Sequence, residues 1–223
     1  MRRVLEPRVV DLVGYQSARY ARRYADDVMA VAAVDEDVAV AYARGLHKLM
    51  AYKDEYEVAR LHLDAVERAK ITAEFGEGAK VKFLLHPPLL RALGLKRKLK
   101  LGPWFVPAFR ALRALRRLRG TPLDVFGWPR VRRAERALIS EYRGLVMDAL
   151  SDADPELARG LAELADVVRG YEDIKLRSID RFRAEAERLT TQGPATDDPP
   201  RTRVLRLAGS RASQRSPVTD SRS

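Results

Sequence analysis

A run of charged residues inside an otherwise helix-forming segment is the part of this chain best suited to chemistry. Residues 51–61 read AYKDEYEVARL, and the charged members are Lys53, Asp54, Glu55, Glu57 and Arg60. Such a run could supply acid–base groups, form exposed helix ion pairs, or form a buried charge network. Exposed pairs add only about 0.2–0.5 kcal/mol each. We therefore favour a buried structural network that joins this helix to later arginines, namely Arg132, Arg133 and Arg136.

Other chemical groups are sparse. The chain has no cysteine, which excludes disulfides, thiolate catalysis and cysteine-ligated iron–sulfur clusters within it. The three histidines, His47, His62 and His86, lack the spacing of metal ligands. His86 precedes two prolines, which is typical of a turn residue. No glycine-rich phosphate loop and no nucleophile–base arrangement is discernible.

The positive charge is concentrated in one segment. Residues 91–133 contain thirteen Lys or Arg against one acid, Asp124, whereas the whole chain of 223 residues has a net charge of +11. On a helical wheel three arginines of this segment share the face opposite the apolar one, namely Arg110, Arg113 and Arg117. That face could be solvated, dock an acidic protein, or follow nucleic acid; a CoA phosphate is a further alternative. No helix-turn-helix or RRM-type pattern supports nucleic acid.

Helical periodicity predicts the elements that position these groups. We expect a mainly α domain over residues 1–189. Pro7 suits the first position of its first helix, where a backbone N–H would have no partner. Two long helices, over about 7–33 and 38–63, should form an antiparallel hairpin, with acidic residues 35–37 at the start of the second. Alternating residues at 80–86 and 95–101 predict a small two-stranded β-hairpin.

Further helices are expected at 103–119, 130–150, 155–168 and 171–189, with Gly120 in the left-handed position that closes the first of them. Trp104 and Trp128 flank that basic helix and its loop, where large aromatics usually anchor a core, although anchoring a partner is the alternative. Residues 190–223 are rich in Arg, Ser and Pro and predict a disordered basic tail.

Several motifs in order resemble the C-terminal region of the bacterial fused indolepyruvate:ferredoxin oxidoreductases. The resemblance covers roughly residues 8–189 and rests on residues 51–61, FLLHPPLL at 83–90, GPW at 102–104, LRGTP at 118–122, RRAER at 132–136, ISEY at 139–142 and RGY at 169–171. One departure is Glu172-Asp173, which stands where the family pattern has Gly-His. Collinear matches of this extent are more specific than any one motif.

The resemblance implies an accessory role. The family oxidises aryl 2-oxoacids to acyl-CoA with thiamine diphosphate, Mg and [4Fe–4S] clusters, and passes electrons to ferredoxin. This chain lacks the Gly-Asp-Gly motif of a thiamine diphosphate site and has no cysteine ligands. We therefore expect no activity from the chain alone. It would pack on catalytic subunits that carry those cofactors, and an acidic ferredoxin is a possible second partner.

Two alternatives stay open. The chain could be a basic helical nucleic-acid-binding protein, or a fragment of a split fused gene with no independent function. No apolar stretch is long enough for a membrane span and the first residues lack the apolar core of a secretory signal, so we expect a cytoplasmic protein. The 2-oxoacid and the stoichiometry are not encoded in any recognisable feature.

Overall fold

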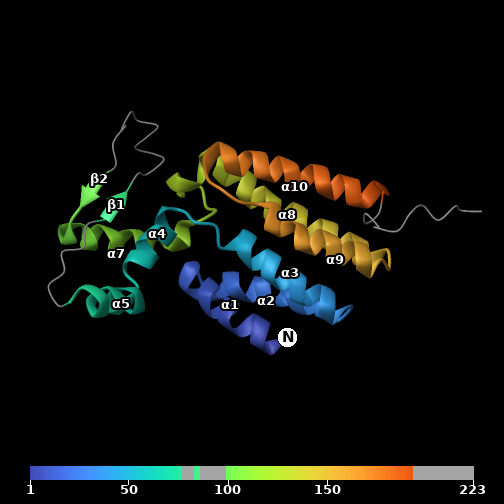
Figure 1. The fold of residues 1–223 in the computed structure, drawn as a ribbon, viewed down its shortest axis with the longest axis horizontal. Helices are drawn as coiled ribbons and strands as arrows, with labels where there is room; N and C mark the ends of the chain where they lie inside the picture. Colours follow the sequence, from blue (N-terminus) through green and yellow to red (C-terminus); the bar gives the residue numbers. More distant parts are fainter. Residues whose placement is uncertain (77–82, 86–98, 193–223) are drawn as a thin grey trace, which may run out of the picture.

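The computed structural model describes residues 1–76, 83–85 and 99–192, and this part of the chain is mainly helical (Figure 1). Its α-helices are α1 (Arg2–Tyr15), α2 (Ala18–Ala32), α3 (Glu36–Met50), α4 (Glu55–His62), α5 (Ala65–Phe75), α7 (Val106–Ala114), α8 (Arg130–Ser151), α9 (Pro155–Glu163) and α10 (Glu172–Gln192). Short 3-10 turns are η1 (Pro103–Phe105), η2 (Leu115–Leu118), η3 (Val125–Gly127) and η4 (Leu164–Val167).

Six helices, α1, α2, α3, α8, α9 and α10, pack into one body around a continuous hydrophobic core (Figure 1). Buried tyrosines form much of this core. The rings of Tyr42 and Tyr142 stack with centroids 5.4 Å apart, and the Tyr142 hydroxyl donates to the Ala162 carbonyl at 2.9 Å. The core therefore holds α3, α8 and α9 together through both aromatic packing and a satisfied hydroxyl.

The two long helices expected at the N-terminus are wrong, because each is divided in two. Ser17 accepts a hydrogen bond from the Tyr20 N–H at 3.2 Å and begins α2, and Asp54 accepts from the Glu57 N–H at 2.8 Å and begins α4. Both side chains cap free N–H groups and so favour a new helix start over continuation. The hairpin that remains is formed by α2 and α3, and Asp35 caps α3 as expected.

The expectation for Pro7 is also wrong. Helix α1 begins at Arg2, so Pro7 lies inside the helix rather than at its first position. An interior proline removes one backbone hydrogen bond and strains the preceding turn. Packing compensates, because Val4, Leu5 and Val9 are partly buried against the core on both sides of the proline.

The predicted helix at 103–119 is three pieces, η1, α7 and η2. Within it Phe109 is fully buried, whereas Leu115 is 47% exposed, so the broad apolar arc is not a core face along its whole length. The left-handed Gly120 is confirmed, with a φ of +74°.

Strands β1 (Phe83–Leu85) and β2 (Leu99–Leu101) pair antiparallel, with Phe83 opposite Leu101. The other residues expected in this hairpin, and His86, lie outside the described residues. Helix α10 continues to Gln192, three residues beyond the helix end expected at 189. The rest of the expected disordered tail, from residue 193 to 223, also lies outside the described residues.

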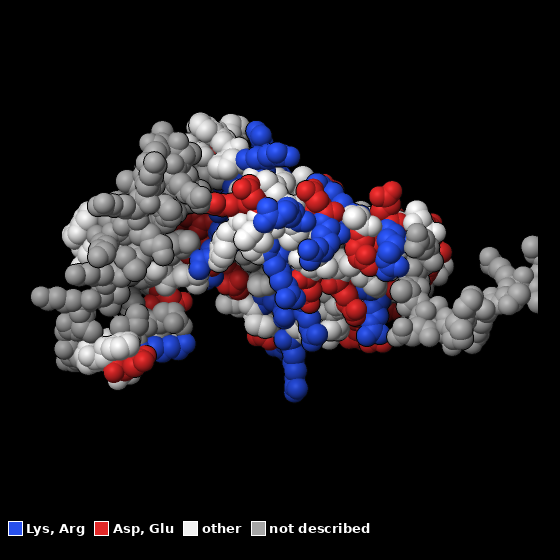
Figure 2. All heavy atoms as spheres, turned by 45° about the horizontal axis from the view of Figure 1, so that its top comes forward, with Lys and Arg blue, Asp and Glu red and all other residues white. Residues whose placement is uncertain are grey.

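Charges on the helical body are mixed. On the face drawn in Figure 2, Lys and Arg side chains are interspersed with Asp and Glu over the body. Among the described helices, none combines the length and the apolar composition that a membrane crossing requires.

Candidate functional site

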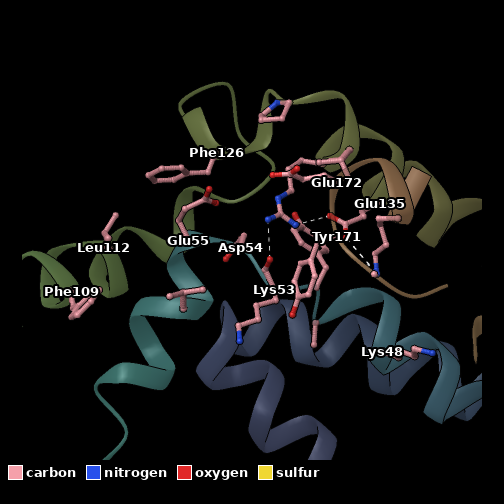
Figure 3. Close-up of a pocket in the computed structure, with 18 of the residues that line it drawn as sticks. Lys48, Lys53, Asp54, Glu55, Phe109, Leu112, Phe126, Glu135, Tyr171 and Glu172 are labelled. Atoms are coloured by element: carbon pink, nitrogen blue, oxygen red, sulfur yellow. Dashed lines mark hydrogen bonds and ion pairs between the residues drawn. The ribbon is translucent and has the colours of Figure 1, made fainter. Parts of the chain in front are cut away.

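A cavity of about 740 Å³ lies where α4 and α7 meet the first turns of α8 and α10 (Figure 3). Its apolar wall comprises Tyr52, Val58, Phe105, Phe109, Leu112, Phe126 and Val131. Its charged wall comprises Lys48, Lys53, Asp54, Glu55, Arg132, Glu135, Glu172 and Lys175. The volume is in the range typical of small-molecule sites. The charged run predicted from the sequence thus borders a cavity rather than a continuous core.

Asp54 anchors the start of α4 through a buried ion pair with Arg119. Arg119 Nε and Nη2 donate to the two Asp54 carboxylate oxygens at 2.5 and 2.6 Å, and Nη1 donates to the Tyr15 carbonyl. Both side chains are almost fully buried. The guanidinium also lies 3.6 Å from the centroid of the Tyr15 ring. This bidentate pair connects α1, α4 and the turn after η2.

A second cluster links α8 and α10 to the segment before α4. Arg132 donates from Nη1 to Glu135 Oε2 at 2.8 Å and from Nη2 to the Lys53 carbonyl at 2.8 Å. Lys175 Nζ lies 3.7 Å from Glu135 Oε1. Burial lowers the pKa of Lys175, although Glu135 opposes that shift. The cluster fixes one wall of the cavity by pairing the Glu135 carboxylate with two cations.

A third cluster shapes the loop before α8. Arg136 donates from Nη2 to the Gly127 carbonyl at 2.7 Å and lies 3.4 Å from Asp124 Oδ2, which also accepts from the Gly120 N–H at 2.9 Å. A Cβ on Gly127 would overlap both Arg136 and Asp124. Glycine is therefore required here by close approach rather than by its backbone angles.

Glu57 and Arg60 face away from the cavity toward α1. Arg60 donates to both Glu57 oxygens, at 2.8 and 2.7 Å, and to Asp11 Oδ1 at 2.8 Å. His47 Nε2 lies 3.0 Å from the other Asp11 oxygen. The hydrogen bond from His47, with Arg60 nearby, lowers the pKa of Asp11. This group joins α1, α3 and α4.

The predicted network therefore exists in a different form. Asp54 pairs with Arg119 and not with the three later arginines, and Arg132 reaches the Lys53 backbone rather than a side chain of the run. The Lys53 side chain and Arg133 are exposed. Asp11 and Arg119 were missed as pairing residues. The available signal for Arg119 was its position directly before the left-handed Gly120. The chain turns at such a helix end, and the turn directs the Arg119 side chain back toward the body.

Glu55 lines the cavity with a carboxylate whose oxygens are not both paired. Its Oε2 atom is buried without a hydrogen-bond partner in the described part of the chain, as is Oδ1 of Asp124. Burial raises the pKa of Glu55, and Arg132 only partly offsets the shift. In Figure 3 the Glu55 side chain points toward the loop that carries Phe126.

The histidines occupy separate places. His47 contacts Asp11, and the His62 ring lies 5.1 Å from the Phe109 ring with its pKa lowered by burial. Within residues 1–76, 83–85 and 99–192, no group of three His, Cys, Asp or Glu side chains is placed to hold a metal ion.

The expectation that both tryptophans anchor the core is wrong. Trp104 is 71% exposed and Trp128 is 62% exposed; the first lies within the short turn η1 and the second directly follows η3. Three further large side chains, in the loop before α8 and around the start of α10, are exposed as well, and we call the set the apolar rim: Trp104, Leu123, Trp128, Tyr171 and Ile174. The predicted docking arginines, Arg110, Arg113 and Arg117, are also exposed.

The fold and the site define a helical protein with an internal cavity, buried ion pairs and an exposed apolar rim. Residues 1–188 match the model of a family of unknown function, DUF6537, and the chain belongs to that family. No curated protein and no solved structure matches it.

Proposed function

We propose that this chain is a non-catalytic accessory component of an indolepyruvate-type 2-oxoacid:ferredoxin oxidoreductase. It would pack on catalytic subunits that carry thiamine diphosphate, Mg and [4Fe–4S] clusters. The collinear motifs at residues 8–189 suggest this partner. The observation that carries a docking role is the apolar rim, whose five members are exposed on three separate segments, four of them within the cavity lining or next to it in the sequence.

Exposing large apolar side chains such as those of the rim to water costs free energy in a protein that acts alone. Large exposed apolar side chains that gather at one place are characteristic of protein-binding surfaces. Four of the five rim residues belong to the cavity wall or adjoin it in the sequence: Phe105 follows Trp104, Pro129 follows Trp128, Lys175 follows Ile174, and Tyr171 itself lines the cavity. These four residues therefore lie close to a hollow into which a partner side chain could fit.

The buried ion pairs make that surface rigid. Asp54–Arg119 and Arg136–Asp124 hold the segments that present the rim, with Arg136 also bonded to the carbonyl of Gly127, next to Trp128. A surface held in place before binding loses less conformational entropy when the partner arrives. Buried pairs of this kind serve geometry more than net stability.

The nucleic-acid alternative has weaker support. Arg119 is buried in its pair with Asp54, and Arg132 and Arg136 are committed to pairs as well. Two of the thirteen basic residues in segment 91–133, Arg119 and Arg132, are thus unavailable to phosphates. If nucleic acid were the partner, binding would fall steeply between about 50 and 200 mM salt.

The proposal is tested by isolating the chain from its own cells under native conditions. We expect it to co-purify, at a fixed ratio, with subunits that contain thiamine diphosphate and iron and that oxidise an aryl 2-oxoacid. A chain that elutes alone as a monomer, or one that oxidises the 2-oxoacid by itself, would contradict it. A chain that aggregates without partners, in cells where no such subunits accompany it, would identify a gene fragment instead.

A further inference from the structure

The basic helix carries a group of arginines that have no counterions. We call it the arginine cluster; it lies on α7 and η2 and comprises Arg110, Arg113, Arg116 and Arg117. In the described part of the chain, no carboxylate pairs with any of the four, and the Arg116 guanidinium donates to the Arg113 carbonyl at 2.9 Å instead. Arg110, Arg113 and Arg117 are exposed and Arg116 is half-buried, so three of these charges are open to a partner.

Other basic surfaces of this protein are compensated by acids. Helices α2, α8 and α10 carry acids among their arginines, and several of these residues form pairs, such as Arg143–Asp27 and Arg183–Glu141. The stretch of residues 103–119, in contrast, contains no acid. The arginine cluster therefore differs from the mixed charges of the helical body that Figure 2 shows.

The members of the cluster repel one another. Residues three and four apart are neighbours on a helix, so Arg113 lies beside both Arg110 and Arg117. Burial lowers the pKa of Arg116, and the nearby charges of Arg113 and Arg117 lower it further. Since no described acid pairs with the cluster, an anion from outside the chain would relieve this repulsion.

The surface beside the arginines favours a protein partner over nucleic acid. Pro107, Ala111 and Ala114 are small, apolar and exposed on the same helix, so a second helix could approach α7 closely. Guanidinium groups pair bidentately with carboxylates. Arg110 and Arg117 are about two helical turns or roughly 11 Å apart, a span that meets only about three phosphates of one DNA strand.

We propose that the arginine cluster binds an acidic helix of a partner protein, whose carboxylates lie against Arg110, Arg113 and Arg117. The cluster contains arginine and no lysine, which agrees with the enrichment of arginine and the depletion of lysine at protein interfaces. Complementary charge would also speed the encounter of the two proteins. This surface is made of different side chains from the apolar rim, so either proposal can fail while the other stands.

The test uses the full chain and three fluorescent probes: a helical peptide of glutamate and alanine, the same peptide with glutamine in place of glutamate, and a thymidine oligonucleotide of equal charge. Fluorescence anisotropy at about 50 mM salt, where screening is weak, gives the Kd of each probe. We expect the acidic peptide to bind roughly threefold tighter than the oligonucleotide or better, and the glutamine peptide not to bind. Equal or tighter binding of the oligonucleotide, or no saturable binding of the acidic peptide at about 1 mM, would overturn the proposal.

Matched variants locate the interaction. Arg110→Gln/Arg113→Gln should raise the Kd of the acidic peptide roughly fivefold, which is what two exposed ion pairs contribute. The control is Arg19→Gln/Arg22→Gln, which removes two exposed arginines at the same spacing from α2 and should change Kd by less than about twofold. Both variants should unfold at nearly the wild-type temperature, because all four side chains are exposed. An unchanged Kd in the first variant, or equal losses in both, would refute the assignment.

Discussion

Arg119 and Asp54, 65 residues apart in the sequence, form a bidentate ion pair with almost no exposure to solvent. The pair joins the end of η2, within the basic segment, to the N-cap of α4. It places a guanidinium between the Tyr15 ring and the start of α4. The pair fixes the N-cap of α4, the helix that carries the cavity-lining residues Glu55 and Val58.

Replacing Arg119 should therefore destabilise the fold strongly. Arg119→Met leaves the buried Asp54 carboxylate without its cation, and we expect a loss of about 3–5 kcal/mol in the free energy of unfolding. Urea denaturation measures it. The matched control is Arg183→Met, which breaks an exposed pair with Glu141 and should cost about 0–1 kcal/mol. Similar losses in both variants would show that the buried pair has no special role.

Gly45 tests the packing of the body core. A Cβ at this position would overlap the Tyr142 hydroxyl and lie 2.9 Å from the Ala162 carbonyl oxygen. We expect Gly45→Ala to lower the free energy of unfolding by about 1–3 kcal/mol through overpacking.

Gly144 is the control for that change, because it also lies in a helix but a Cβ there meets nothing within 4 Å. Gly144→Ala should stabilise the protein by about 0.5–1 kcal/mol, the intrinsic gain of alanine over glycine in a helix. If both alanine variants were stabilising, the close contact of α3 with Tyr142 would be incorrect.

Glu55 should make stability depend on pH in a defined direction. Its folded-state pKa is raised above the unfolded value of 4.5, so its protonated form is favoured by folding. That contribution is present below pH 4.5 and is lost as the pH rises through the folded-state pKa.

Glu55→Gln mimics the protonated form, so the variant should be more stable than the wild type at pH 8 and equally stable at about pH 4. Thermal unfolding of both proteins across this range, without added ligand, measures the difference. A variant that is less stable than the wild type at pH 8 would show that the ionised carboxylate is satisfied.

The predictable part of the fold is the part set by local patterns. Helical periodicity and the left-handed Gly120 appear in the structure, as does the Asp35 cap. The breaks at Ser17 and Asp54 could have been read from their capping ability, but continuous apolar spacing across them favoured one helix. Helix α1 passes through Pro7 because tertiary packing outweighs a local preference.

The candidate site was predicted less well, since its pairs join distant segments. Charge and spacing placed a network around residues 53–60, yet the partner of Asp54 is Arg119, which periodicity assigned to the end of a basic helix. Whether a tryptophan beside a helix is buried or exposed depends on which way its short turn projects. Trp104 and Trp128 project outward, and sequence spacing carries no such information.

Docking through the apolar rim is tested most directly by the affinity of the purified chain for the thiamine- and cluster-bearing catalytic subunits. We expect the double variant Trp104→Ala/Trp128→Ala to lose at least 2 kcal/mol of binding, roughly a thirtyfold rise in Kd. Val10→Ala/Met29→Ala, which trims side chains on α1 and α2 that are 67% and 52% exposed, should leave Kd unchanged. Equal affinities for the wild type and the tryptophan variant, or no binding of the wild type, would contradict the account.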